Sequence, residues 1–451
     1  MTVLDADMLY LLFDSANMHR WNDHMRPVDL TELDKQAHKA AIAWVLGKFE
    51  ESAGNPVDWM AVMERTLFSF IQRSVLTDLK PQVFHRITAE RSREVNGFVM
   101  QELLRLVPDC DPRFIDRMSE YLDSPKDSKE DAIVRAAHYL ATRWEFRLIY
   151  DSNRSLYGID RTREEIDREI EQHIDLIGVR KVLATGDAFN FIDLVGQLRF
   201  QQRWARTPRI PKTTVLGHSL LVADMMLLHD IDSGADDRKM YNDFYTGLFH
   251  DLPEVLTKDV ITPIKTSVDG LASLLEEIER DMVESEIMPL LDEGWRQEFG
   301  RMVFDPFEDM DDPVLGRRDG FGLKSCDLMC AYMEAFISGR YGISSNTLRE
   351  GEAGIREKLE ERGGAIDCRS LLKQFDALKI RWGCSDDPMR WRRTDAGKGP
   401  GTRECLRRSV VAVDDLETSH VGPEDLGNGD RSVLVLVVLQ DGDHGPGERE
   451  T

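Results

Sequence analysis

The stretch Leu248–Lys265, LFHDLPEVLTKDVITPIK, places an imidazole and two carboxylates within about one helical turn. Residues three and four apart lie on one face of a helix, so His250 and Asp251 can converge on one point while Glu254 stands beside them. The threonines and the aspartate that follow stand where the helix should be ending. This pattern predicts a functional site at the end of a helix.

The composition indicates a large, acidic, globular protein. The chain has 451 residues, which is more than a usual single domain, and 41% of them are hydrophobic. The formal net charge of -24 opposes nonspecific binding to nucleic acid polymers and to anionic membranes, although a local metal or arginine could still bind a small phosphorylated substrate.

The sequence also bears on location and redox state. No apolar run approaches the roughly 18 residues needed to span a bilayer, and the N-terminal MTVLDADMLYLL lacks the basic flank of a secretory signal. We therefore expect a cytoplasmic protein that does not enter membranes. The six cysteines form no CxxC pair, so we expect reduced thiols.

Long segments with apolar residues at helical intervals, such as LASLLEEIERDMVESEIMPLL at 271–291, dominate the chain. They predict an all-α fold over about the first 383 residues. After Cys384 the sequence becomes rich in Gly, Pro, Asp and Arg, which is typical of a poorly ordered tail.

Similar segments recur in the same order in the two halves of the chain. MHRWNDHMRP at 18–27 resembles QQRWARTPRI at 201–210, and LFSFIQR at 67–73 resembles LFHDLPE at 248–254. The pattern predicts two tandem helical copies followed by the tail. The expected divisions are residues 1–150, 151–383 and 384–451.

The first copy is expected to be degenerate. It has Ser69 and Phe70 where the second copy has its adjacent His and Asp, while His38 and His138 stand near the first and last candidate ligand positions. Serine and phenylalanine cannot replace the two central ligands, so we expect no catalytic metal in the first half.

The second half contains four candidate metal ligands on successive segments. Imidazole and carboxylate together suit one divalent first-row metal, such as Mn or Co, better than a soft thiolate site would. A second HD pair, His229 and Asp230, lies too far along the helix that begins near His218 to bind the same ion. The expected ligands are His218, His250, Asp251 and Asp327.

The order His, His-Asp, Asp resembles the HD-domain metal-dependent phosphohydrolases, which are helical bundles. HDLPEVLTKDVITPIK together with KSCDLMCAY, and the Arg203-Trp204 pair ahead of the first ligand, resemble the bacterial 5'-deoxynucleotidases of the YfbR-like group over roughly Leu194–Gly339. The resemblance implies hydrolysis of the 5'-phosphate of (deoxy)ribonucleoside monophosphates, with deoxyribonucleotides preferred.

The resemblance also implies roles for further residues. Glu254 would handle the proton of the attacking water, and Arg203 would hold the phosphate, for which its planar guanidinium is suited. Trp204 would crowd the sugar 2' position, and Asp259 and Thr262 would line the substrate pocket. Gly217 stands before the first ligand where the group often has an acidic residue, which leaves the substrate preference open.

Two other functions stay open from the sequence. One is a different HD activity, such as deoxynucleoside triphosphate triphosphohydrolase or cyclic nucleotide phosphodiesterase. The other is a non-catalytic nucleotide-sensing or scaffolding protein. Because the resembling nucleotidases are dimers, we expect either a homodimer or an internal pseudo-dimer of the two copies.

Overall fold

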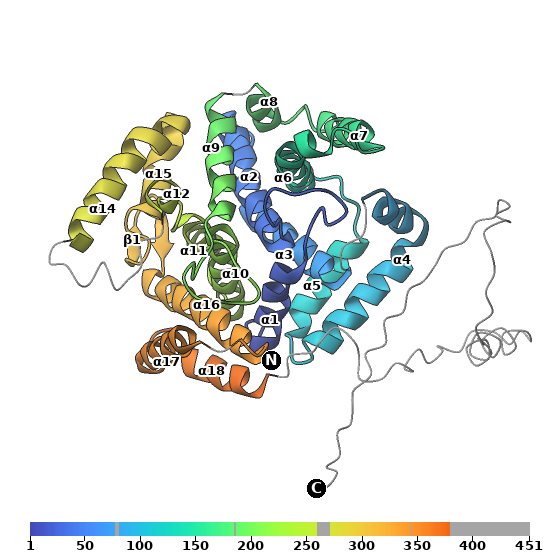
Figure 1. Ribbon diagram of the computed structural model, residues 1–451. Coiled ribbons are helices and arrows are strands. Elements are labelled where there is room, and N and C mark those ends of the chain that lie inside the picture. The colour runs from blue at the N-terminus through green and yellow to red at the C-terminus, as the bar shows by residue number, and fades with distance from the viewer. Residues whose placement is uncertain (77–80, 185, 259–270, 344, 379–451) are drawn as a thin grey trace, which may run out of the picture. The chain divides into compact units, whose positions relative to one another are not determined.

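Helices make up most of the chain that the structure describes (Figure 1). This computed structural model describes residues 1–76, 81–184, 186–258, 271–343 and 345–378, without the side chains of 81–89 and 272. The predicted all-α fold is confirmed, with one short antiparallel pair of strands as the exception. The predicted tail at 384–451 lies outside the described residues, as does the 383/384 boundary.

The first part of the chain contains seven α-helices and one 3-10 turn among the described residues. They are α1 (Ala6–Asp14), η1 (Ser15–Asn17), α2 (Glu32–Ser52), α3 (Trp59–Leu76), α4 (Pro81–Leu106), α5 (Pro112–Asp123), α6 (Lys129–Asn153) and α7 (Ile159–Glu171).

The second part contains the other helices that the structure describes. They are α8 (Ile177–Leu183), α9 (Asp187–Gln197), η2 (Leu198–Phe200), α10 (Val215–Ser233), α11 (Asp237–Phe249), α12 (Glu254–Thr257), α14 (Leu271–Met282), η3 (Val283–Ile287), η4 (Met288–Leu290), α15 (Glu293–Val303), α16 (Gly320–Arg340), α17 (Asn346–Glu361) and α18 (Cys368–Ala377). The two strands β1 (Met310–Asp312) and β2 (Gly316–Arg318) pair between α15 and α16.

Side-chain caps fix where the central helices begin. The Thr31 hydroxyl accepts a hydrogen bond from the Asp34 amide at 3.2 Å, and α2 starts at the next residue. The Thr214 hydroxyl does the same for the Gly217 amide at 3.1 Å, so that α10 begins just ahead of His218. These caps set the positions of the side chains that follow along each helix.

The core joins the two parts of the chain through α2. Trp44 on α2 is fully buried, and its indole N–H donates to the Tyr241 hydroxyl of α11 at 2.8 Å. Its ring packs against Phe249 and Trp295 with centroids 5.2 and 5.8 Å away. Residues Met1–Ile380 accordingly form one compact unit, and the division into two tandem copies at 150/151 stays a prediction.

The backbone repeats an unusual geometry at corresponding points of the two parts. Trp21 and Trp204 both have a φ of 55°, in the left-handed region that non-glycine residues rarely adopt. Each lies in a loop closed by an antiparallel bridge, His19 to Thr31 in one case and Gln202 to Thr214 in the other. The indole N–H groups of the two tryptophans each donate to a buried glutamate of a later helix, α6 or α16.

This shared geometry corrects the expected position of one residue. Lys35 follows its helix cap by the same number of residues as His218 follows Thr214, so Lys35 rather than His38 matches the first ligand. The His38 Nε2 instead hydrogen-bonds to the Ile192 carbonyl at 2.8 Å, away from that position. The sequence pattern alone placed the first ligand position about one helical turn further along α2, at His38.

Two further sequence expectations can be compared with the described residues. The four described cysteines are buried and form no disulfide with one another, and the reduced state of the thiols stays a prediction. None of the described helices is both long enough and apolar enough to cross a membrane.

Candidate metal centre

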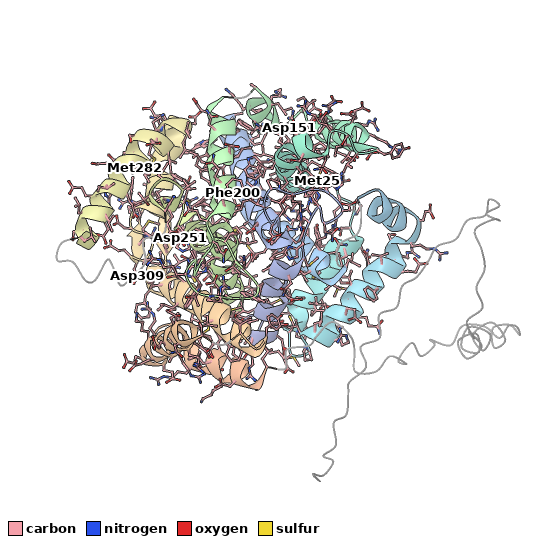
Figure 2. All side chains as sticks on the ribbon, in the orientation of Figure 1. Met25, Asp151, Phe200, Asp251, Met282 and Asp309 are labelled. Carbon is pink, nitrogen blue, oxygen red and sulfur yellow. The ribbon has the colours of Figure 1, made fainter. Side chains whose placement is uncertain are left out.

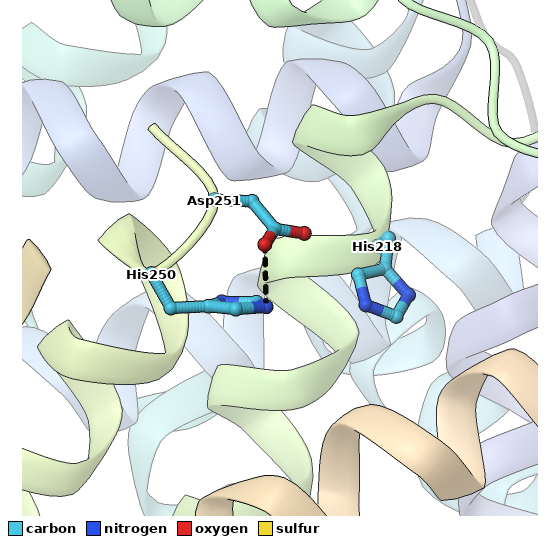
Figure 3. A group of neighbouring side chains, drawn as sticks. All are labelled: His218, His250 and Asp251. Atoms are coloured by element: carbon cyan, nitrogen blue, oxygen red, sulfur yellow. Dashed lines mark ion pairs between the residues drawn. The ribbon is translucent and has the colours of Figure 1, made fainter. Parts of the chain in front are cut away.

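Three of the expected ligands meet between α10 and the end of α11. His218 lies in the first turns of α10, His250 follows the last residue of α11, and Asp251 lies in the turn that leads to α12. One ligand atom from each lies within 4.8 Å of the others (Figure 3). The site is marked by Asp251 among the described side chains in Figure 2.

The backbone orients the His250 ring for this role. Its Nδ1 lies 2.8 Å from the Gly247 carbonyl, which can only accept, so Nδ1 carries a proton and donates. Its Nε2 therefore faces Asp251, with the Asp251 Oδ1 3.3 Å away. A carbonyl that fixes the far nitrogen of a histidine is the usual support for a metal-binding imidazole.

The two aspartates of the site are held ionised. Burial alone would raise the pKa of Asp251, but His250, His218 and Arg203 lower it well below its ordinary value. The pKa of Asp327 is also well below the ordinary value, since the His218 hydrogen bond and the Lys324 ammonium outweigh its burial. Both carboxylates are thus negatively charged near neutral pH and available to a cation.

Asp327 reaches the site from α16. Its Oδ1 lies 3.0 Å from the His218 Nε2, and its Oδ2 accepts a hydrogen bond from the Lys324 ammonium at 2.7 Å. Lys324 was not among the expected site residues. Its position one turn before Asp327 on the same helix was the available sequence signal.

Arg203 lies beside this group in the loop that precedes α10. Its Nη1 is 3.6 Å from the Asp251 Oδ2, and its Nε is 3.3 Å from the Glu334 Oε2. Burial would lower the pKa of Arg203, but the carboxylates of Glu334, Asp251, Asp327 and Glu254 raise it above its ordinary value. This guanidinium is therefore charged, and it faces the site.

Glu334 is a site residue that the sequence reasoning missed. It is fully buried on α16, where one carboxylate oxygen accepts the Trp204 indole N–H at 2.8 Å and the other accepts the Thr213 hydroxyl. Burial raises its pKa, but Arg203 and Arg209 together bring it down to about 2. A signal existed, because Glu334 lies two turns after Asp327 on the same helix face.

Of the remaining expected residues, Glu254 is described by the structure, and Asp259 and Thr262 are not. Glu254 begins α12, and its charge contributes to the pKa of Arg203, so it lies near the site. Asp259 and Thr262 lie outside the described residues. In the second HD pair, the Asp230 carboxylate binds the Lys239 ammonium at 2.5 Å, and neither Asp230 nor His229 belongs to the group around His218.

The chemistry of this donor set fits a divalent ion. Two imidazoles and two ionised carboxylates are ligands for first-row metals, and the order of the four residues along the chain follows the sequence expectation. Among the residues that the structure describes, His218, His250 and Asp251 are the possible ligands that lie close enough together to hold one ion.

The family model described as an HD domain matches residues 195–344. This part of the chain is an HD domain. The HD domain contains all four expected ligands, and the resemblance noted in the sequence is confirmed at this level. The first 194 residues lie outside the match.

Two curated relatives of the HD domain are 5'-deoxynucleotidases. The chain is 27% identical over 157 residues to one from Pasteurella multocida (strain Pm70), which covers 32% of this chain and 72% of the relative. It is 24% identical over 176 residues to one from Vibrio atlanticus (strain LGP32), which covers 38% of this chain and 86% of the relative.

A solved structure is also similar. It is an HD-domain phosphohydrolase from Listeria innocua, with 20% sequence identity and a TM-score of 0.36, and the similarity covers 42% of this chain and 90% of that chain.

Proposed function

We propose that the HD domain hydrolyses the 5'-phosphate of nucleoside monophosphates, with deoxyribonucleotides preferred, and that it uses one divalent metal ion such as Mn or Co. The observation that carries this proposal is the convergence of His218, His250 and Asp251 within 4.8 Å, next to a charged arginine. The two 5'-deoxynucleotidase relatives support the substrate class.

The four ligands have the chemistry that a hydrolytic metal requires. His218, His250, Asp251 and Asp327 would hold the ion, which would act as a Lewis acid toward the phosphate and lower the pKa of water. The Nδ1 hydrogen bond of His250 leaves its other nitrogen for this purpose.

Arg203 is the residue that we assign to phosphate binding. It is held by Glu334 at 3.3 Å, so its planar fork has a fixed orientation, and it lies 3.6 Å from a proposed ligand. An arginine fixed in this way can donate two parallel hydrogen bonds to phosphate oxygens. Glu254, which contributes to the charge around Arg203, would accept the proton of the attacking water.

Trp204 is the residue that we assign to selection against ribonucleotides. Its indole is fixed by the hydrogen bond to Glu334, the same carboxylate that holds Arg203. The phosphate-binding group and the ring are therefore held in one arrangement, so that a ring placed at the sugar 2' carbon would exclude a hydroxyl there.

The experiment is phosphate release from a panel of substrates by the full chain with added Mn or Co. We expect release from deoxynucleoside 5'-monophosphates, slower release from the ribonucleotides, and loss of turnover in Glu254→Gln. Tripolyphosphate release from deoxynucleoside triphosphates, or opening of a cyclic nucleotide, would assign another HD activity. Binding of nucleotides without any turnover would assign a sensing or scaffolding role.

We also propose that the first half acts as the permanent partner of the HD domain, as an internal pseudo-dimer. Helix α2 packs against α10, and the Thr214 hydroxyl that caps α10 donates to the Asp34 carboxylate of α2 at 2.5 Å. The helix that carries His218 is thus anchored on the first half. A homodimer of whole chains is the alternative, and sedimentation equilibrium separates the two. The cytoplasmic location stays a prediction.

A further inference from the structure

A buried cationic cluster lies between α2, α3 and α6 in the first half. It consists of Lys35, Lys39, Arg73 and His138, with Ser69 beside them. The Lys35 ammonium hydrogen-bonds to the His138 Nδ1, and the Lys39 ammonium donates to the Ser69 hydroxyl at 2.8 Å. None of the sequence expectations gave this cluster a function.

The cluster occupies the position in the first half that the metal centre occupies in the HD domain. The helix caps and the two tryptophans with left-handed backbone geometry occur in both halves, and they show which residues of α2 correspond to which residues of α10. The glutamates that accept the two tryptophans set the register of α6 against α16, and the similar LFSFIQR and LFHDLPE segments match α3 with α11 and its following turn. The correspondences are Lys35 with His218, Ser69 with His250, Arg73 with Glu254, and His138 with Asp327.

The same two positions touch each other in both halves, but the residues that occupy them differ in charge. His218 touches Asp327 in the HD domain, and Lys35 touches His138 at the matching point. The acid Glu254 is matched by the base Arg73. The site in the HD domain therefore offers carboxylates to a cation, whereas the matching site in the first half offers cationic donors. Positive charge excludes a divalent metal from the first-half site and favours an anion.

The charges around His138 support this conclusion. Its pKa is well below the ordinary value, because of burial first and then because of four cations, Lys35, Lys39, Arg20 and Arg73. The pKa of Lys35 is lowered as well, by burial and by its cationic neighbours, in spite of the charge of Glu32. The His138 ring is therefore neutral near pH 7, and Lys39 and Arg73 carry positive charge beside it.

The nearby carboxylates supply only part of the negative charge. Glu32 binds Arg20 at 2.7 Å and also lies 3.9 Å from the Arg73 Nε, and Glu145 binds both Arg20 and Arg199, at 2.8 and 3.0 Å. Asp224 faces Lys39, but burial raises the pKa of Asp224 to about 8, so its carboxyl group is largely neutral at pH 7. Glu32 is thus shared between Arg20 and Arg73, and the lysines and arginines around His138 still outnumber the ionised carboxylates beside them.

We propose that the cationic cluster binds the phosphate group of a small molecule, as a second, non-catalytic site. Phosphate is a tetrahedral anion that accepts hydrogen bonds from an arginine fork and from ammonium groups, and the cluster holds both kinds of donor. The depth is comparable with that of the metal centre. Lys35 and Lys39 are 0% and 1% exposed, and His218 and His250 are 0% and 5% exposed.

The outer members of the cluster provide a route for the ligand. The side chain of Arg73 is 14% exposed, as is that of Asp327 at the matching edge of the metal centre. His138 and Ser69 are also only partly buried. A phosphate would reach Arg73 and His138 first and then the deeper ammonium groups.

The test is calorimetric titration of the full, metal-free chain with inorganic phosphate. The Arg203→Met background removes the phosphate-binding arginine of the HD domain, so that any remaining binding belongs to another site. We expect saturable binding at one site per chain in this background, at least tenfold weaker when Arg73→Met is added. Arg65→Met is the matched control on the same helix, because Arg65 binds Asp131 at 2.9 Å outside the cluster, and it should leave the affinity unchanged.

A measurement on the Arg203→Met chain without further substitutions guards against misfolded variants. Added phosphate should shift the imidazole resonances of His138, assigned with His138→Gln, and should raise the pKa of this ring. No saturable phosphate binding in the Arg203→Met background, or equal affinity with and without Arg73→Met, would overturn the proposal and leave the cluster as a purely internal network.

A second titrant distinguishes the source of the phosphate. A non-hydrolysable phosphonate analogue of a nucleoside monophosphate that binds more tightly than inorganic phosphate would identify a nucleotide site. Equal affinities would identify a site for the phosphate group alone. The titrations need neither metal nor turnover, so their result is independent of the hydrolysis assigned to the HD domain.

Discussion

Asp34 on α2 and Gly217 on α10 approach each other so closely that a Cβ on Gly217 would lie 2.8 Å from the Asp34 Oδ1. The two residues stand at the same position after their helix caps, one in each half of the chain. The space between the helices thus admits one carboxylate, and glycine is the residue that leaves room for it.

The first prediction follows from this contact. Gly217→Ala should lower the free energy of unfolding by about 1–3 kcal/mol through steric overlap, although alanine favours a helix by about 1 kcal/mol over glycine. Gly354→Ala in α17 is the matched control, because a Cβ there meets nothing within 4 Å, and this variant should be neutral or stabilising. Adding Asp34→Ala should recover part of the loss, with a coupling of about 1 kcal/mol in a denaturant double-mutant cycle. Strict additivity would show that the two residues do not interact.

Glu145 should be important for stability rather than for turnover. It is fully buried and accepts from Arg20, Trp21 and Arg199, so Glu145→Gln should cost about 3 kcal/mol by leaving two guanidinium groups without full compensation. In urea denaturation, Glu165→Gln should change stability by less than about 0.5 kcal/mol, since Glu165 forms a helical surface pair with Arg161. Similar losses in both variants would contradict the role of the buried network.

Asp224 should make the stability depend on pH. Burial raises its pKa to about 8, from an ordinary value of 3.8. The folded chain therefore holds this proton more tightly than the unfolded chain, so Asp224 lowers the stability as pH rises from about 4 to about 8. The Asp224→Asn side chain cannot ionise. The melting temperature of this variant minus that of the unmodified chain should therefore increase from pH 5 to pH 8. The opposite trend would show that Asp224 is ionised and paired with Lys39.

Trp204 offers a test of sugar selection that separates the ring from its N–H group. Trp204→Ala should raise ribonucleotide turnover relative to deoxyribonucleotide turnover, measured as the ratio of kcat/KM values. Trp204→Phe keeps a ring but loses the hydrogen bond to Glu334. It should therefore lower kcat/KM for both kinds of substrate alike and leave their ratio nearly unchanged. An unchanged ratio in Trp204→Ala would place the discrimination elsewhere.

Local patterns in the sequence were sufficient for the helices and for the candidate ligands that the structure brings together. The apolar periodicity predicts the long helices, and the spacing of His250 and Asp251 is a property of one short segment. Asp327 could be expected from the order of ligands that the sequence shares with HD-domain proteins.

Contacts between distant segments could not be predicted in the same way. Glu334 is a single glutamate in an apolar helix, and the five partners found among the described residues come from the loop before α10 and from α10 itself. The contact of Asp34 with Thr214 depends on how α2 and α10 pack. The match of Lys35 with the first ligand became visible only when the helix caps fixed the register.

The central claim is that the chain holds one catalytic metal, in the HD domain and not in the first half. Metal analysis of the full chain after loading with Co and removal of loosely bound ions tests it most directly. We expect about one Co per chain, none retained by His250→Ala, and no change in His38→Ala, whose ring contacts the Ile192 carbonyl instead. Two equally tight ions per chain, or full retention of Co by His250→Ala, would contradict the account.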